Sequence, residues 1–424
     1  MSNPVRSLAE GAELSAAWLL ERCAIFGITR LADITGLDRL GIPCHAATIV
    51  NGSDIISSYS GKGVTQAVSR ISAMMEAIER NASAWDTIRV RFASTTQLVS
   101  ERTRHVPPED FTEQLASDYR GGESVISWVA AHDVTAGHEF LVPAELAFSG
   151  YPPSGYLQHR AFSTTTSNGL AAGFDLDQAV QHGIREVLER DIVSLCELRA
   201  VCFDAGFLEA IARKFGVDVG SLGRSFQCRP GVGVRIEPRT LPHACRAIYD
   251  RFAAIGVRVA IRALPNDLGL PAFGACAAEQ LSQDNWLCGA GYGVHTDPGS
   301  ALEGALVEIA QGRATSLQGA REDYHAGHLK SRFASMPRSD WLFDDTGELA
   351  SFEDVGRLFS NAGAEHCVAN YCSAARAVGL DRVLSVTFTH LPVPAVRILI
   401  PGVETTHPTQ GYSRLGQRAT SLRV

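Results

Sequence analysis

Three segments of the 424-residue chain each carry a pair of oxygen-bearing side chains three residues apart. The pairs are Glu76 and Glu79, Glu186 and Glu189, and Glu308 and Gln311. Side chains at i and i+3 lie on the same face of a helix, so each pair presents its oxygens together. Neighbouring like charges repel unless a cation is close, and Mg²⁺ prefers carboxylate and carbonyl oxygens as ligands. We therefore predict that the three helices converge on Mg²⁺ and that this ion holds a nucleotide.

A single pair of this kind is usually a solvated helix face, or an exposed ion pair worth less than about 1 kcal/mol. Arg80 and Arg190 directly follow the first two pairs, but a neighbour at i+1 points about 100° away around the helix. The carboxylates therefore need another counter-charge, and their repetition in three segments favours a metal site. Arginines near such a site, and Lys62 in the segment SGKG, are suited to binding phosphate groups.

Other short motifs give little support to competing functions. SGKG does not match the P-loop pattern, because Ile56 occupies the place of the first glycine and Gly63 that of the hydroxyl residue. GAGYGV, residues 289–294, does not match GxGxxG, and we interpret His295 as a turn or core histidine. Neither GxSxG nor HExxH occurs, so hydrolase and zinc-protease functions have no motif here.

Composition indicates a globular enzyme. The chain has 38 Lys and Arg against 46 Asp and Glu, a net charge of −8, so we expect no nucleic-acid partner. No apolar run approaches the roughly 20 residues of a membrane-spanning helix, and Glu10 and Glu13 interrupt any secretion signal. The ten cysteines form no CxxC pair, which is typical of buried free thiols in a reducing cytoplasm. We predict a soluble cytoplasmic protein.

The elements that must position these residues alternate between helix and strand, which predicts an α+β fold. Each glutamate-bearing helix follows a small-residue segment that we interpret as a turn. The expected turns are 57–63 and 289–299, with TTTSNGLAAG before the second helix. The expected helices are 8–26, 64–85, 175–199 and 299–318, and the expected strands are 41–50, 126–142, 382–388 and 396–401. Residues 99–125 are polar and contain proline, which favours a loop or linker.

The motifs together resemble the YcaO family. The resemblance rests on SGKG with SAMMEAIER, TSNGLAAG with REVLERD, GYGVHTDPGSAL with VEIAQGR and GAREDY, and finally VPAVRILIPGVE. It covers residues 25–405, in the family's order. It implies the α+β YcaO fold, with mixed sheets and three pseudo-repeated Glu-bearing helices around a nucleotide site. The implied division is an N-terminal segment packed on the core (1–60), a catalytic domain (61–405) and a C-terminal tail (406–424).

The resemblance also implies a reaction, in which a nucleophile adds to a backbone amide carbonyl and ATP phosphorylates the resulting oxyanion. ATP and Mg²⁺ are the implied cofactors, and no side chain is assigned as the nucleophile. The implied metal ligands are Glu76, Glu79, Glu186, Glu189, Glu308 and Gln311. The implied ATP-binding residues are Lys62, Ser72, Arg80, Ser167, Asn168, Arg190, Arg313 and Arg321.

The nucleophile decides the product within the family: a substrate Cys, Ser or Thr gives an azoline, external sulfide a thioamide, and an amine a macrocyclic amidine. Azoline-forming members commonly end in a PxPxP tail, and this sequence ends in PGVETTHPTQGYSRLGQRATSLRV. The chain is therefore more similar to thioamide-forming members, which act with a TfuA-type partner that supplies sulfur. The alternatives are an azoline-forming cyclodehydratase, a metal-dependent hydrolase and a non-catalytic peptide-binding scaffold. The expected partners are a peptide or protein substrate and a second copy in a homodimer.

Overall fold

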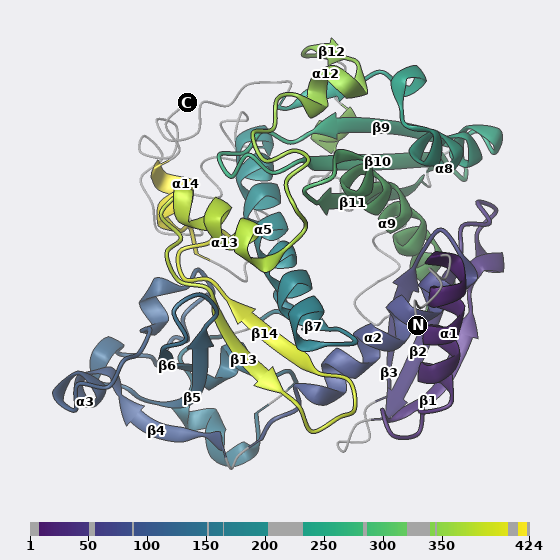
Figure 1. Cartoon of the computed structure of the whole chain (residues 1–424). Coiled ribbons are helices and arrows are strands. Elements are labelled where there is room, and N and C mark those ends of the chain that lie inside the picture. The colour runs from purple at the N-terminus through teal and green to yellow at the C-terminus, as the bar shows by residue number, and fades with distance from the viewer. Residues whose placement is uncertain are drawn as a thin grey trace, which may run out of the picture.

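The computed structural model describes residues 8–50, 56–86, 89–150, 152–163, 165–201, 232–282, 286–319, 340–343, 346–405 and 414–421. The strands in these residues form three sheets, with helices lying beside and between them (Figure 1). The mixture of antiparallel sheets and long helices confirms the α+β prediction. The division at residues 60 and 405 stays a prediction, and residue 60 lies within a strand of the first sheet, β3 (Ile56–Lys62).

The first sheet has the order β1-β2-β3 and is antiparallel throughout. Its strands are β1 (Ile28–Asp33), β2 (Cys44–Val50) and β3 (Ile56–Lys62). Helices α1 (Leu8–Leu20) and α2 (Gln66–Ala82) pack beside it, and α2 contacts both β2 and β3. Thr65 begins α2, because its hydroxyl accepts a hydrogen bond from the Val68 amide.

The second sheet has the order β11-β10-β9-β8-β12. Its strands are β8 (Val234–Ile236), β9 (Arg258–Ala263), β10 (Ala272–Gln280), β11 (Trp286–Val294) and β12 (Leu349–Ala350). Helix α9 (Pro298–Gln318) packs along β11 and β10, with α8 (His243–Ala254) next to it. Asp297 caps the start of α9, and Gly319 ends the helix with a φ of 64°.

The third sheet has the order β4-β5-β13-β14-β7, and β6 pairs with β5. Its strands are β4 (Arg91–Ser94), β5 (Val125–Asp133), β6 (Glu139–Pro143), β7 (Leu170–Ala172), β13 (Leu384–Phe388) and β14 (Ala395–Leu399). The remaining helices are α3 (Thr95–Ser100), α4 (Ala144–Ala147), α5 (Leu176–Val201), α12 (Phe352–Gly356), α13 (Val368–Ala377) and α14 (Gln417–Ser421). Short 3-10 helices cover 35–37, 108–110, 121–123, 154–159, 238–240 and 340–343. Helix α5 contacts β14 and β7 of this sheet and β11 of the second sheet (Figure 1).

The three helices predicted to carry the glutamates are confirmed as α2, α5 and α9. Each buries its apolar side in a different hydrophobic cluster. Met74 and Ile78 of α2 pack in the cluster that contains Trp128. Ile184 and Leu188 of α5 pack in a second cluster, and Leu302 and Leu306 of α9 pack in a third. Because the three apolar sides point into separate cores, the polar sides are left to face one another.

The expected turns at 57–63 and 289–299 are wrong, since residues 56–62 form β3 and residues 286–294 form β11. Their glycines allow a strand to lie directly against a helix. A Cβ on Gly61 would lie 2.0 Å from the Ala73 nitrogen of α2, and one on Gly291 would lie 2.1 Å from the Ala305 oxygen of α9. The helix expected over 8–26 also ends earlier, because α1 stops at Leu20 and turns follow.

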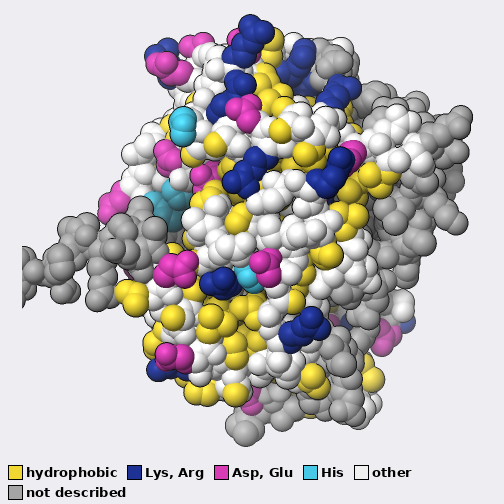
Figure 2. Space-filling view, turned by 90° about the vertical axis from the view of Figure 1, so that its right-hand side faces the viewer, with side chains coloured by type: hydrophobic (Ala, Val, Ile, Leu, Met, Phe, Trp, Pro, Cys, Tyr) yellow, Lys and Arg dark blue, Asp and Glu magenta, His cyan; other side chains and the backbone are white. Residues whose placement is uncertain are grey.

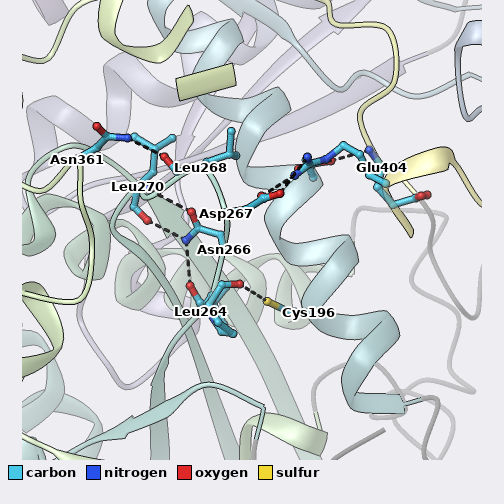
Figure 3. Close-up of polar contacts among 11 residues, drawn as sticks. Cys196, Leu264, Asn266, Asp267, Leu268, Leu270, Asn361 and Glu404 are labelled. Carbon is cyan, nitrogen blue, oxygen red and sulfur yellow. Dashed lines mark hydrogen bonds and ion pairs between the residues drawn. The ribbon is translucent and has the colours of Figure 1, made fainter. Parts of the chain in front are cut away.

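The rear of α5 is fixed by a buried carboxylate, Asp191, and Figure 3 shows Asp267 and Glu404, whose contacts belong to the same network. Asp191 is 0% exposed and accepts hydrogen bonds from the Glu404 amide at 2.7 Å and from Arg418 Nη2 at 2.7 Å. Arg418 belongs to α14 and also pairs with Asp267 at 2.8 Å. These contacts tie the C-terminal helix and the segment after β14 to the helix that carries Glu186 and Glu189.

Surface charge is mixed on the face that Figure 2 shows, where Lys and Arg side chains are interspersed with Asp and Glu. None of the described helices is long and apolar enough to cross a membrane. The cysteines within the described residues are free thiols, and Cys44, Cys196 and Cys372 are among those that are buried.

We expect Gly291→Ala to lower the free energy of unfolding by about 2–3 kcal/mol, because the added methyl group must displace the α9 backbone. Urea unfolding measures this change. Gly11→Ala in α1 is the matched control: its Cβ would meet nothing within 4 Å, so it should leave stability equal or raise it by up to about 1 kcal/mol. A Gly291→Ala variant as stable as the control would contradict the close-packing argument.

Candidate nucleotide and metal site

A cavity of about 1000 Å³ lies between the polar sides of α2, α5 and α9, with β3 and β11 contributing to its wall. The structure brings ten of the predicted site residues to this wall. They are Lys62, Ser72, Glu76, Glu79, Arg80, Glu186, Glu189, Arg190, Glu308 and Gln311. Residues from three distant parts of the sequence therefore form one polar chamber, as the paired oxygens predict.

The first carboxylate group combines Glu76 and Glu79 of α2 with Glu186 of α5. Glu79 is 6% exposed, and its Oε1 accepts a hydrogen bond of 3.0 Å from the Ala172 amide at the end of β7. Glu76 pairs with Arg80 at 2.9 Å. Burial, and then the charges of Glu76 and Glu186, raise the pKa of Glu79 well above its ordinary value. The three acidic groups are therefore close enough to repel one another.

The second group combines Glu189 of α5 with Glu308 of α9 at the edge of β11. The Val294 amide donates to Glu189 at 3.1 Å, and the Tyr292 amide lies 3.4 Å from Glu308. Lys62 Nζ also pairs with Glu308 at 3.1 Å. Because β11 is the last strand of its sheet, its outward amides can hold both carboxylates in place.

Gln311 lies one helical turn beyond Glu308 on α9. Its Nε2 donates to the Ser60 carbonyl of β3, which leaves the amide oxygen as the atom that could coordinate a cation. The Ser72 hydroxyl accepts a hydrogen bond of 3.3 Å from the Lys62 amide and so connects α2 to the end of β3. Both contacts set the position of β3, and hence of Lys62, relative to the glutamate helices.

The donor set fits Mg²⁺ with a nucleotide. Burial, and then the Glu76 charge, raise the pKa of Glu186 to about 7, and burial and Glu308 raise the pKa of Glu189. When a divalent cation binds between crowded carboxylates of this kind, it favours their ionised form. Within the described residues, no three acidic, imidazole or thiol groups are close enough to hold an ion alone. This agrees with the usual Mg²⁺ site, where one or two carboxylates share the ion with phosphates and water.

The cavity also contains four cationic side chains, namely Lys62, Arg80, Arg185 and Arg190. Lys62 and Arg80 are paired with glutamates. In the described part of the chain, Arg185 and Arg190 make no hydrogen bond or ion pair that would occupy their guanidinium groups. A planar guanidinium matches phosphate oxygens well, so these two arginines are available to an anionic ligand.

Three predicted ATP-binding residues do not line the cavity. Arg313 is 1% exposed and is held by Asp38 at 2.7 and 3.0 Å and by Glu279 at 2.6 Å. Arg313 therefore lies away from the cavity wall, in a buried ion pair that joins α9 to β10 and to Asp38, which follows the 3-10 helix at 35–37. Ser167 and Asn168 precede β7 and lie outside the cavity wall. Arg321 lies outside the described residues.

The structure adds residues that the sequence analysis missed. His182 and Arg185 line the cavity from the same face of α5 as Glu189, and Tyr59 lines it from β3. The Arg80 guanidinium lies 5.5 Å from the centre of the Tyr59 ring. His182 is exposed to the cavity, where reduced solvation and then the charge of Arg185 lower its pKa, so this imidazole is neutral at physiological pH. Positions 182, 185 and 189 follow the helical period, a signal that extending the glutamate face would have found.

Comparison with known proteins identifies the family. The family model described as YcaO cyclodehydratase, ATP- and Mg²⁺-binding, matches residues 60–404. The chain belongs to the YcaO family. That description confirms ATP and Mg²⁺ as the cofactors and the resemblance found in the sequence.

Two relatives and two solved structures are similar over most of this chain. An uncharacterized protein of Methanothermobacter thermautotrophicus is 31% identical over 91% of both chains, and a protein in the tfuA 3′ region of Rhizobium leguminosarum bv. trifolii is 28% identical over 93% of this chain and 88% of its own. YcaO from Methanopyrus kandleri, bound with AMPPCP and Mg²⁺, superposes with a TM-score of 0.65 at 20% identity, covering 95% and 94%. A heterocyclase in complex with substrate and cofactor gives 0.69 at 18% identity, covering 92% of this chain and 52% of that one. These structures confirm the predicted YcaO fold.

We expect Glu186→Gln to stabilise the metal-free YcaO chain at pH 8. The pKa of Glu186 is about 7 in the folded state against 4.5 without burial, so the folded state binds more protons between these values. Stability should therefore fall as pH rises through this window and then stay level. Urea unfolding at pH 5 and pH 8 with a chelator should show that the variant has lost part of this dependence. The exposed Glu353→Gln serves as control, and an unchanged pH dependence in Glu186→Gln would contradict the assignment.

We expect Glu189→Gln to weaken binding of Mg²⁺ with the ATP analogue AMPPCP by at least about tenfold, measured by calorimetry. The amide keeps the shape of the side chain but removes one negative charge from the ligand set. The exposed Glu139→Gln should leave the affinity unchanged. Undiminished binding by Glu189→Gln would show that this carboxylate does not take part in holding the metal.

Proposed function

We propose that this YcaO protein modifies the backbone of a peptide by phosphorylating an amide oxygen with ATP, and that it installs a thioamide. We further propose that a TfuA-type partner delivers the sulfur. The observation that carries the proposal is the cavity in which three helices place five carboxylates, an amide and three arginines, with Lys62 added by β3. YcaO proteins are an ATP-dependent enzyme class, and all six side chains predicted to hold the metal line this cavity.

The chemistry requires ATP because an amide oxygen is a poor leaving group. Hydrosulfide adds to the carbonyl carbon, and the carbonyl π electrons move to oxygen. This oxyanion attacks the γ-phosphorus, the bond to the β-phosphate oxygen breaks, and ADP departs. The C–O bond then breaks as C=S forms, and the S–H proton leaves with the phosphate as hydrogen phosphate. Such a transfer depends on positioning and charge neutralisation more than on covalent help from the protein.

The residues of the cavity suit these demands. Glu76, Glu79, Glu186, Glu189 and Glu308 would hold Mg²⁺, which supplies charge neutralisation at the phosphates. Lys62, Arg80 and Arg190 supply positive charge to the triphosphate. No cysteine is among the residues that line the cavity in the described part of the chain. This supports a sulfur atom that arrives with the substrate or from a partner.

Two observations bear on which product is formed. The relative in the tfuA 3′ region, 28% identical over most of both chains, supports thioamide formation with a TfuA-type partner. The description of the family as a cyclodehydratase, and the similarity in fold to a heterocyclase, favour azoline formation as the second candidate. The two products differ in mass in opposite directions, so they can be separated directly.

Mass spectrometry of peptides and digested proteins from the native host, with and without an intact gene for this chain, tests the proposal. We expect one or more peptides whose mass is higher, by the difference between sulfur and oxygen, only when the chain is present. Purified chain and partner should reproduce this change on the unmodified peptide with Mg²⁺, ATP and sulfide. Glu189→Gln should abolish it.

Loss of one water without any sulfur source would refute the thioamide proposal and establish azoline formation. A peptide bound without change in mass, and without ADP production, would indicate a scaffold. ADP production with no modified peptide would indicate a hydrolase. Each of these results contradicts the proposal in a distinguishable way.

A further inference from the structure

Arg185 is one of the two cavity cations whose guanidinium groups have no partner in the described part of the chain. It lies on α5 one turn before Glu189 and one turn after His182, and all three side chains line the cavity. It is half-buried, and within the described residues no carboxylate, carbonyl or other acceptor pairs with its guanidinium group. An unpaired guanidinium that faces the cavity next to the carboxylates is available to an anion that is present only during binding or reaction.

The surroundings of Arg185 differ from those of Arg190. Arg190 is the leading positive charge that favours ionised Glu186 in the first carboxylate group. Arg185 is the leading positive charge that favours ionised Glu189 in the second group, where Lys62 also lies. Arg190 also favours ionised Glu189, so it lies within reach of both groups, whereas Arg185 lies on α5 one turn before Glu189 and acts on the second group.

On its other side, Arg185 faces neutral aromatic groups. The rings of His295 and His366 stack with centres 4.0 Å apart, and His366 Nδ1 lies 2.9 Å from the Tyr371 hydroxyl. The Asp297 amide donates to His295 Nδ1 at 2.9 Å, so His295 carries its proton on Nε2. Burial, and the charge of Arg185, lower the pKa of His295 to about 4 and lower that of His366. His295 directly follows Val294 of the cavity wall, so the cavity has a neutral wall at this edge, which suits an uncharged peptide better than a triphosphate.

The reaction proposed above creates a charge that neither substrate carries at the start. When the nucleophile adds to the amide, a full negative charge develops on the carbonyl oxygen, and it then passes to the phosphoryl group under transfer. A donor fixed beforehand at that position lowers the barrier, because it need not reorganise as the charge forms. It contributes little to binding of ATP itself, since the charge is absent in the ground state.

We propose that Arg185 is a catalytic residue, which binds the oxyanion of the tetrahedral amide adduct and then the phosphoryl group that this oxyanion accepts. The peptide amide lies at the Glu189–Glu308 end of the cavity, beside Val294 of β11 and the adjoining His295. The inference rests on the proposed amide activation, and it holds for either a thioamide or an azoline product because both pass through this oxyanion.

The test compares a ground-state and a transition-state analogue on the full chain. Calorimetry measures the affinity for two complexes: Mg²⁺ with AMPPCP, and Mg²⁺ with ADP and aluminium fluoride. In the second complex, planar aluminium fluoride mimics the phosphoryl group and its apical water takes the place of the oxyanion. We expect Arg185→Gln to keep AMPPCP affinity within about threefold and to lose at least about tenfold for the aluminium fluoride complex. Arg185→Lys should retain part of that affinity, because it keeps the charge without the fork of donors.

Two controls separate this role from others. Arg190→Gln should weaken both complexes, as an ordinary phosphate ligand would. Arg376→Gln, on the exposed side of α13, should change neither. Equal losses for both complexes in Arg185→Gln, or no loss for either, would overturn the proposal, as would a native chain that gains no affinity from aluminium fluoride. A native chain that fails to bind Mg²⁺ with AMPPCP would instead refute the proposed function as a whole.

Discussion

Mutual repulsion among carboxylates is the constraint on which the rest of the structure depends. Five glutamates share one cavity, and burial together with their neighbours' charges raises the pKa values of Glu79, Glu186 and Glu189. Such a cluster destabilises the metal-free fold, so the surrounding structure must keep the three glutamate helices from moving apart. It does so with three independent hydrophobic cores, one behind each glutamate helix, and with backbone amides of β7 and β11 that hold individual carboxylates. Mg²⁺ and a nucleotide then convert repulsion into binding energy.

Helix α5 connects this balance to the whole molecule. The side of α5 that faces the cavity contributes Glu186 to the first acidic group and Glu189 to the second. The opposite side contributes Asp191, which is buried against Arg418 and the Glu404 amide. A buried carboxylate left without these partners would be strongly destabilising, so the segment after β14 and helix α14 are bound to the position of α5. The close approach of Gly291 to α9 and of Gly61 to α2 fixes the other two helices in the same way, through backbone contact instead of long side chains.

The sequence predicted the site better than the strands around it. Spacing of three between glutamates is a local signal, and the helical period converts it directly into a shared face, so ten predicted residues meet in the cavity. Glycine-rich SSYSGK and CGAGYGV were misread as turns because strand glycines that admit a helix look the same as turn glycines in one sequence. The place of Arg313 outside the cavity wall could not be predicted, because its partner Asp38 is 275 residues away and no local pattern reveals such a pair. Arg185 and His182 could be predicted by following the glutamate face of α5 toward the start of the helix.

The division of labour between the two unpaired arginines follows from where charge is present and where it develops. Triphosphate charge exists before the reaction, so a cation such as Arg190 beside the first acidic group acts on binding. Charge on the amide oxygen exists only after the nucleophile has added, so a cation beside neutral rings can act on the transition state without tightening the ground state. The described cavity wall offers no cysteine of its own, and the same oxyanion forms whichever sulfur, oxygen or nitrogen atom attacks. One arrangement of acidic groups and arginines can therefore serve several products, with the choice of nucleophile made by the substrate or partner that reaches the neutral wall.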